Sequence, residues 1–377
     1  MSASGSVATS DLADDRRFME LALSLGRRGL GRTWPNPAVG AVIVKDGQIV
    51  GRGWTQPGGR PHAEIEALRR AGEMTRGATL YVTLEPCSHH GKSPPCADAV
   101  IACGIARVVS AMEDPNPEVA GRGHARLRSA GIAVDVGIEA ATARRDHAGH
   151  ICRVRDGRPH VMLKLAISAD GKAAGAGRQR VGITGKAVRD RVHLMRARSD
   201  AIMIGIGTAL ADDPVLTCRL PGMAKMSPTR VVLDADLRLP MQSRLLATAG
   251  ETPLWIITSK HAPAASEIAL HQRGAEVVRV AEKEGRFDLR EVLKLLARRG
   301  ITRLMVEGGP TVASALIEAD LIDEAVFFHS PIVIGEEGLP ALEPRAAKSC
   351  SEHLNRVSSE PVGPDRQEIY ERGSDHV

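Results

Sequence analysis

The chain has 377 residues, which at about 150 residues per domain suggests two domains. Apolar residues make up 43% and charged residues 25%, so the chain can bury a core without disulfide bonds. Only 2% of the residues are aromatic, which disfavours a protein that stacks single-stranded bases, and a net charge of +5 permits anionic ligands without requiring nucleic acid. No apolar run reaches the roughly 18 residues of a membrane span, and the N-terminus lacks a secretory pattern, so we expect a cytoplasmic protein.

The first half alternates predicted helices and strands in a way typical of a layered α/β domain. Residues 1–10 are expected to be a disordered lead, and Asp11 is a plausible cap of the first helix. Two apolar segments joined at Asp46-Gly47 predict a β-hairpin. The predicted helices cover 11–31, 61–71, 95–103 and 122–130, and the predicted strands cover 39–45, 48–54, 78–84, 106–112 and 132–137.

A second α/β pattern follows, so we expect one domain over 11–150, a linker over 151–159 and another domain over 160–377. One helix is expected over 184–198, capped by Thr184, and a strand, glycine turn and helix over 303–319. The remaining predicted strands cover 161–167, 200–205, 229–234, 254–258, 276–280 and 324–335, with a last one near 366–370.

A histidine and two cysteines in the first half have the spacing of a metal site. His62, Cys87 and Cys96 can supply three zinc ligands, which leaves a fourth position for water, as in catalytic zinc sites. Glu64 lies two residues beyond His62 on a predicted helix, where it can shuttle protons beside that water. Pro95 suits the first turn of a helix, whose dipole favours a thiolate at Cys96.

Two other interpretations of these residues stay open at this point. The two cysteines can be ordinary buried residues, and a lone His-x-Glu is common. A structural zinc site is the other, because His89 or His90 could supply a fourth ligand.

The surrounding strings resemble a known group of enzymes. The pattern H-x-E followed by P-C-x-x-C is the signature of the zinc-dependent cytidine-deaminase superfamily, but here eight residues separate Cys87 from Cys96. The string TLEPCSHHGKSPPC, with PNPAVG before it and DPNPEVAGRG after it, resembles the deaminase half of the bifunctional riboflavin-biosynthesis deaminase/reductases. The resemblance extends over nearly the whole chain from about residue 14.

This resemblance implies roles for particular side chains of the first domain. His62, Cys87 and Cys96 would bind one zinc ion, and Glu64 would be the proton shuttle. The family positions that hold the substrate's base or its ribose phosphate are occupied here by Asn36, His89, Lys92, Asp114 and Asn116. Family members often have a histidine where this chain has Thr55, which is a departure from the family pattern at a substrate contact.

In the second half, no G-x-G-x-x-G follows a predicted strand, so a Rossmann site is not supported. The segment 306–311 ends a strand in two glycines, and Pro310 starts a helix whose free N–H groups, with the Thr311 hydroxyl, can receive a phosphate. Alone, this pattern is more typical of an ordinary strand-to-helix turn. KLAISADGK, GIGTALADDPVLTCR and VEGGPT, however, resemble the reductase half of the same family, which has a dihydrofolate-reductase-like fold and uses NADPH.

The resemblance again implies residue roles. Lys164 and Asp212 are candidates to polarise or protonate the sugar carbonyl. NADPH would contact Ala166, Thr208, Asp212, Gly309, Pro310, Thr311, Val312, Ala313, Ser314 and Ala315. The reductase substrate would contact Arg180, Arg196, Leu216, Arg219 and Glu307. Gly182 occupies a position that is usually tryptophan, so a cofactor contact there would be reduced to backbone.

We therefore expect a cytidine-deaminase-like three-layer α/β domain followed by a dihydrofolate-reductase-like α/β domain. The expected reactions are the zinc-dependent deamination of a diaminopyrimidine ribosyl phosphate and the NADPH-dependent reduction of the ribosyl chain to ribityl. The expected partners are this small phosphorylated pyrimidine and further copies of the chain (a dimer or tetramer), with no nucleic acid and no membrane. The alternatives are a nucleic-acid or nucleoside deaminase with an accessory domain, a noncatalytic zinc scaffold, and a deaminase attached to an inactive reductase.

Overall fold

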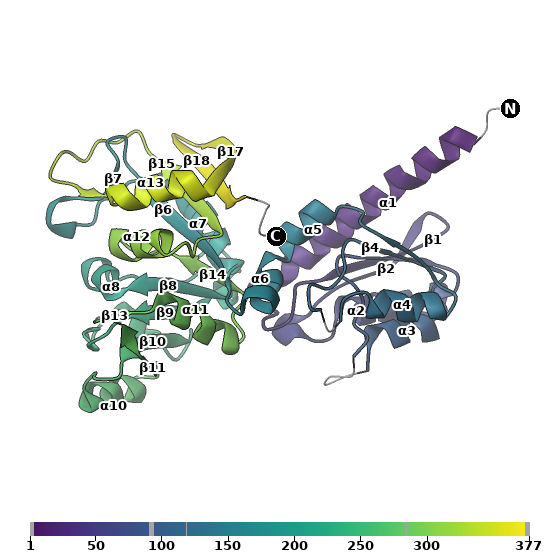
Figure 1. The fold of residues 1–377 in the computed structure, drawn as a ribbon, viewed down its shortest axis with the longest axis horizontal. Helices are drawn as coiled ribbons and strands as arrows, with labels where there is room; N and C mark the ends of the chain where they lie inside the picture. The colour runs from purple at the N-terminus through teal and green to yellow at the C-terminus, as the bar shows by residue number, and fades with distance from the viewer. Residues whose placement is uncertain (1–3, 90–93, 118, 284, 374–377) are drawn as a thin grey trace. The chain divides into compact units, whose positions relative to one another are not determined.

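The computed structural model describes residues 4–89, 94–117, 119–283 and 285–373 (Figure 1). The chain divides into two compact units, Met1–Gly157 and Arg158–Val377. This division falls inside the predicted linker 151–159, although helix α6 (Ala148–Asp156) occupies most of that segment. Among the described helices, none combines the length and the apolar character that a membrane span requires.

The first unit is built on a five-stranded sheet in the order β2-β1-β3-β4-β5. Strands β1 and β2 form the predicted antiparallel hairpin, β3 pairs antiparallel with β1, and β4 and β5 continue in parallel. The strands are β1 (Gly40–Lys45), β2 (Gln48–Trp54), β3 (Thr79–Val82), β4 (Arg107–Ser110) and β5 (Ala133–Val136). The helices are α1 (Ser4–Gly26), α2 (Ala63–Ala71), α3 (Cys96–Ala102), α4 (Arg122–Ser129) and α5 (Ala140–Asp146), followed by α6.

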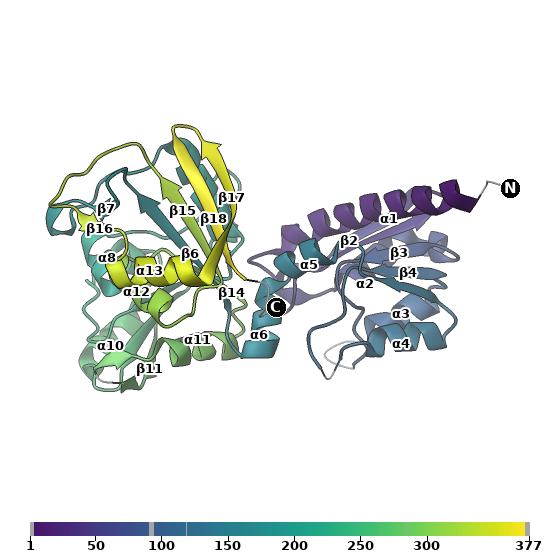
Figure 2. The same ribbon diagram turned by 45° about the horizontal axis from the view of Figure 1, so that its top comes forward.

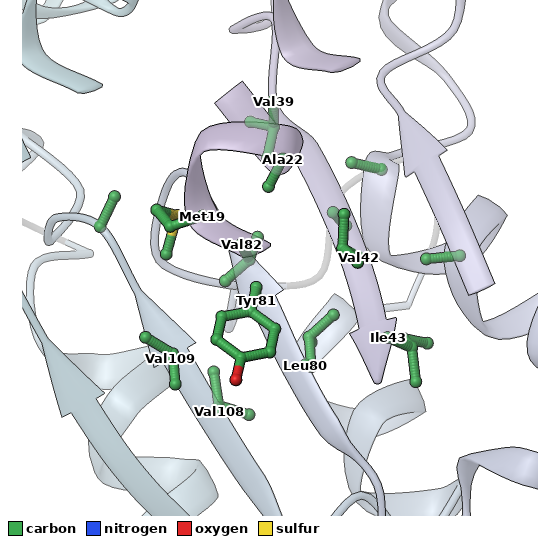
Figure 3. Close-up of a cluster of buried hydrophobic side chains, with 14 of the residues drawn as sticks. Met19, Ala22, Val39, Val42, Ile43, Leu80, Tyr81, Val82, Val108 and Val109 are labelled. Carbon is green, nitrogen blue, oxygen red and sulfur yellow. The ribbon is translucent and has the colours of Figure 1, made fainter. Parts of the chain in front are cut away.

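Helices cover both faces of this sheet, as a three-layer fold requires. Figure 2 shows α1 and α5 on one face and α2, α3 and α4 on the other. Figure 3 shows Met19 and Ala22 of α1 in one buried cluster with Val42, Tyr81 and Val109 of the central strands. These strands are buried on both faces, which explains their continuous apolar runs instead of an alternating pattern.

Two expectations about the first helix are wrong. Helix α1 begins at Ser4, so residues that were expected to form a disordered lead belong to it. Position 11 is therefore inside the helix and does not cap it. The hairpin turn is confirmed in detail, because Asp46 and Gly47 both have positive φ, as the tight turn between twisted strands requires.

The second unit is built on a nine-stranded sheet in the order β11-β10-β9-β8-β14-β6-β15-β18-β17. The strands from β11 to β15 in this order are parallel, whereas β18 and β17 join as an antiparallel pair. The parallel strands are β6 (His160–Ile167), β8 (Ala201–Gly205), β9 (Thr229–Leu233), β10 (Leu254–Ser259), β11 (Glu276–Val280), β14 (Arg303–Val306) and β15 (Glu324–His329). The antiparallel strands are β17 (Leu354–Val362) and β18 (Asp365–Arg372), of which only β18 was expected.

Several helices and short strands connect this sheet. The helices are α7 (Lys186–Ala197), α8 (Ile206–Asp212), α9 (Arg244–Ala247), α10 (Ala264–Gln272), α11 (Leu289–Arg298), α12 (Pro310–Glu318) and α13 (Pro344–His353). The short strands are β7 (Lys172–Ala174), β12 (Glu282–Lys283), β13 (Arg286–Phe287) and β16 (Leu339–Pro340). Thr184 does not cap α7, because the N-cap is Gly185 and no side chain caps it there.

The start of the second unit is fixed by an ion pair. The Arg158 guanidinium donates to both carboxylate oxygens of Asp323, at 2.6 and 2.7 Å, and Asp323 also accepts the N–H of Val161 at 2.8 Å. The first residues of β6 are thereby joined to the segment that precedes β15, its neighbour in the sheet.

Candidate functional sites

The three predicted metal ligands lie together at the ends of secondary-structure elements. His62 is the N-cap of α2, Cys96 is the first residue of α3, and Cys87 lies in the loop after β3. Their ligand atoms all lie within 4.8 Å of one another, and they form the group with metal-ligand geometry among the described residues. His62 Nδ1 is 3.3 Å from Cys96 Sγ and 3.7 Å from Cys87 Sγ.

These distances suit zinc. A tetrahedral site with a Zn–N bond of about 2.1 Å and a Zn–S bond of about 2.3 Å places nitrogen and sulfur about 3.6 Å apart. The two observed distances lie on either side of this value. His89 is not in the group, and His90 lies outside the described residues, so the described residues supply three ligands and not four. One imidazole and two thiols with a fourth position left over is the donor set of a catalytic zinc site.

The electrostatics of the cluster favour a thiolate and a buried carboxyl group. The Cys96 side chain donates to Cys87, and the N–H of Cys96 at the start of α3 lies 3.3 Å from the Cys87 sulfur; together with His62 they lower the pKa of Cys87 to about 4. The helix start therefore stabilises a thiolate at Cys87. The expectation of a thiolate at Cys96 is wrong for the pair as it stands, because the hydrogen bond to Cys87 and burial raise the pKa of Cys96. Glu64, in the first turn of α2, is 3% exposed and interacts with the Cys96 side chain, and burial raises its pKa.

Asn36 in the loop before β1 and Thr55 in the loop after β2 each bond to the backbone of the other loop. The Asn36 side-chain amide donates to the Gly59 carbonyl at 2.8 Å. Gly59 has φ of +84°, and a Cβ there would stand 2.6 Å from the Asn36 amide nitrogen, so this close approach requires glycine. Thr55 is buried, and its hydroxyl accepts the N–H of Val39 at 3.0 Å. The threonine in the unusual position thus stabilises the PNPAVG loop.

The other predicted substrate residues of this unit lie near one another. The Asp114 carboxylate accepts the N–H of Asn116 at 2.9 Å and lies 3.5 Å from His150 Nε2 of α6. Burial opposes ionisation of Asp114, but its interactions with His150 and, more weakly, with His89 lower its pKa. His89 and Asp114 are therefore close enough to interact, whereas Lys92 lies outside the described residues.

In the second unit, most predicted residues line one cavity of about 390 Å³. It lies at the carboxyl ends of β8 and β14 and along β6, three neighbouring parallel strands. Ligands of open α/β sheets bind at this edge of the sheet. The predicted residues that line the cavity are Lys164, Ala166, Arg180, Arg196, Thr208, Asp212, Arg219, Glu307, Gly309 and Pro310.

A buried ion pair lines this cavity. Arg196 of α7 donates to both oxygens of Glu307, at 2.6 and 2.8 Å, and to the Thr217 carbonyl at 3.1 Å. Although burial opposes it, the Arg196 charge lowers the pKa of Glu307 to about 2. Burial lowers the pKa of Lys164, and the Glu307 carboxylate opposes that shift. The Arg196 guanidinium, which was expected to contact the reductase substrate, is therefore already paired with Glu307.

A second cavity, of about 630 Å³, adjoins the first and shares Thr208 and Gly309 with it. Thr208 accepts the N–H of Gly309 at 2.9 Å, and this bond joins α8 to the start of α12. The cavity is also lined by predicted cofactor residues of α12, namely Thr311, Val312, Ser314 and Ala315. Ala313 and Leu216 line neither cavity: both are buried, and Leu216 belongs to a hydrophobic core.

Sequence reasoning missed several residues at these sites. Arg189 and His193 line the first cavity, and with Arg196 they follow a spacing of four and three residues along α7, which a helical projection would have placed on one face. In the first unit, the buried carboxylate of Glu85 was missed, and no sequence signal marks its backbone partners.

Comparisons with known proteins agree with both units. Residues 12–112 match the model of the cytidine and deoxycytidylate deaminase zinc-binding region, and residues 159–367 match that of the RibD C-terminal domain. The riboflavin biosynthesis protein RibD of Escherichia coli (strain K12) is 43% identical over 348 residues, which cover 87% of this chain and 92% of that protein. The RibD protein of Aquifex aeolicus is 42% identical, covering 85% and 88%.

Solved structures agree as well. Acinetobacter baumannii RibD superposes with a TM-score of 0.84 at 35% identity, over 96% of this chain and 100% of that chain. A Thermotoga maritima structure, described as a diaminohydroxyphosphoribosylaminopyrimidine deaminase/5-amino-6-(5-phosphoribosylamino)uracil reductase, superposes with a TM-score of 0.83 at 34% identity, with the same coverage.

The fold and the two sites define a two-domain enzyme, with a zinc-binding deaminase unit followed by a reductase unit. The chain belongs to the RibD family of bifunctional riboflavin biosynthesis proteins. The predicted fold class and the predicted pair of activities are confirmed. The two other classes considered, a nucleic-acid deaminase and a noncatalytic zinc scaffold, are set aside.

Proposed function

We propose that the first unit deaminates 2,5-diamino-6-(5-phosphoribosylamino)pyrimidin-4(3H)-one to 5-amino-6-(5-phosphoribosylamino)uracil. The observation that carries the proposal is the cluster of His62, Cys87 and Cys96 with the buried Glu64 beside it. The names of the related proteins supply the substrate class. His89, Asp114 and Asn116 would contact the base or the ribose phosphate, together with Asn36 and Lys92.

The deamination replaces the ring amino group with oxygen from water and releases ammonia. A zinc ion held by His62, Cys87 and Cys96 would supply Lewis-acid activation of that water. Glu64 accepts the water proton and returns it to the departing nitrogen. The burial that raises the pKa of Glu64 suits this role, because a base and acid used in turn works best with a pKa near the working pH.

We further propose that the second unit reduces the ribosyl chain of this product to ribityl. NADPH would supply the hydride and lie along α12, from the larger cavity into the smaller one, where Ala166 and Asp212 would contact it beside the substrate. Lys164 and Asp212 would polarise or protonate the ring-opened carbonyl. Burial raises the pKa of Asp212, although Arg180 opposes the shift, and a carboxyl group that keeps its proton can donate it.

The phosphate of this substrate would bind at Arg219 and Arg180. Burial lowers the pKa of Arg219, and the nearby charges of Arg196 and Arg244 lower it further. Such crowding of positive charge favours a bound anion. The same family assignment carries the expectation of a cytoplasmic homo-oligomer, which cell fractionation and analytical ultracentrifugation test.

Product mass spectrometry tests both reactions. Wild type without NADPH should exchange an amino group for oxygen, and with NADPH the product should also gain two hydrogen atoms. Glu64→Gln should retain zinc but lose the first change, while still reducing the supplied aminouracil ribosyl phosphate. Glu66→Gln is the matched control, because Glu66 lies on the same helix but pairs with Arg69 and Arg70. A zinc-loaded, folded wild type that returns the substrate unchanged would refute the proposal.

A further inference from the structure

The carboxylate of Glu85 is a buried group that the proposed reaction does not use. Its side chain is fully buried and lies two residues before the ligand Cys87. One oxygen accepts the N–H groups of Gly123 and His124, at 2.7 and 3.2 Å. The other accepts those of Asp114 and Gly121, at 3.1 and 2.9 Å. Four backbone donors from a distant part of the chain thus converge on one side chain.

Two of these bonds complete a helix that has no cap of its own. The N-cap of α4 is Gly121, which has no side chain to accept the free N–H groups of the first turn. The Glu85 carboxylate accepts two of them, and its negative charge also faces the positive end of the helix. Glu85 therefore serves as the cap of α4 from the loop after β3.

The other two bonds hold the segment that contains the proposed substrate residues. Glu85 accepts the N–H of Asp114, and the Asp114 carboxylate accepts the N–H of Asn116. The contact is also close at the start of α4, because a Cβ on Gly123 would stand 2.1 Å from the Pro86 carbonyl oxygen. Pro86 directly precedes Cys87. The substrate segment and the metal-ligand loop are thereby fixed against each other.

We propose that Glu85 is a positioning residue for the deamination, which sets Asp114 and Asn116 at a fixed distance from the Cys87 loop. The inference rests on the proposed substrate-binding role of these two residues. Glu85 itself does not touch the reacting atoms. It acts through the backbone of the segment that it holds.

The isosteric change Glu85→Gln separates this role from zinc binding. Glutamine keeps one acceptor oxygen but places an N–H donor against two backbone N–H groups. The charge-assisted hydrogen bonds that hold the segment are lost, so its displacement should raise KM for the diaminopyrimidine substrate at least about tenfold. Zinc content should stay at the wild-type level, kcat should fall less than KM rises, and reduction of supplied aminouracil substrate should be unchanged.

Asp15→Asn is the matched control. Asp15 is a buried carboxylate of the same unit with three hydrogen bonds, from Tyr81 and Arg107, none of which reaches the substrate segment. It should lower stability and leave KM unchanged. Glu85→Asp covers the case in which Glu85→Gln does not fold, since it keeps the charge and both acceptor oxygens while shortening the side chain. It should raise KM less than tenfold and more than twofold.

The possible results are distinguishable. A rise in KM for the Glu85 variants but not for Asp15→Asn supports the proposal. An unchanged KM in folded Glu85 variants overturns it, and so does a loss of zinc that matches the loss of activity, because Glu85 would then support the metal site instead. If Asp114→Asn also leaves KM unchanged, the substrate assignment fails and not only the role of Glu85.

Discussion

Replacing Arg196 by methionine tests the buried ion pair of the reductase unit. The side chains of Arg196 and Glu307 are each 11% exposed, and methionine would leave the Glu307 carboxylate without its main partner. Breaking a buried pair in this way costs about 3–5 kcal/mol. The pKa of Glu307 leads to a similar figure: a fall from 4.5 to about 2 corresponds to about 3 kcal/mol of stability near neutral pH.

The same pKa gives the sign of the pH dependence. Because the pKa of Glu307 is lower in the folded protein, the contribution of the pair is fully present above about pH 4.5. It is lost as the pH falls toward 2. Arg196→Met should therefore be less stable than wild type at pH 7, and the difference between the two proteins should shrink with acidification.

Urea unfolding followed by fluorescence measures this effect. Trp255 is the one tryptophan of the second unit, so a background with Trp34→Phe and Trp54→Phe lets it report alone. Lys294→Met is the control, because its pair with Glu291 is about half exposed and should contribute less than about 1 kcal/mol. A difference below about 1 kcal/mol in the free energy of unfolding between Arg196→Met and its parent would refute the reasoning, because an unpaired buried charge destabilises the fold by more than that.

Three further predictions concern the two sites. Thr55→Val should lower the melting temperature of the first unit, because the N–H of the buried Val39 loses its hydroxyl acceptor at a cost of about 1–3 kcal/mol. The control is Thr142→Val, whose hydroxyl bonds the Glu139 side chain, and it should change the melting temperature far less. Gly182→Trp should fold normally, because a Cβ there meets no atom within 4 Å. The added ring should cover the cofactor and lower KM for NADPH, because Gly182 lines the smaller cavity. A KM for NADPH that does not fall would show that the cofactor does not use this position. Removal of zinc by a chelator should abolish deamination and spare the reduction of supplied aminouracil substrate, and restored deamination on adding zinc back would exclude unfolding as the cause.

The elements of both sheets were predictable where the local pattern is strong. Buried parallel strands such as β8 and β10 are continuous apolar runs. The turn residues Asp46-Gly47 mark the hairpin of β1 and β2. Strand β17 was missed because nearly all its side chains are exposed and Pro361 lies near its end, so neither alternation nor an apolar run marks it. Strand β17 forms through its pairing with β18, and this pairing is not encoded in the local sequence pattern.

The metal ligands were predictable because their chemistry needs particular residue types at particular spacing. Glu85 was not, because its partners are backbone N–H groups, which every residue except proline has and which leave no mark in the sequence. The ion pair of Arg196 could not be predicted from the sequence for a related reason. Whether a guanidinium is free for phosphate or paired depends on Glu307, which is 111 residues away along the chain.

The order of strands in the two sheets has a consequence for synthesis on the ribosome. Every strand of the first sheet lies before residue 137, so this sheet can close while most of the second unit has yet to be made. In the second sheet, β6 is made first but lies between β14 and β15, residues 303–306 and 324–329. This strand must wait for almost the full length of the chain, and contacts between such distant residues form slowly. The deaminase half therefore matures early, while β6 stays without both of its neighbours until translation is nearly complete.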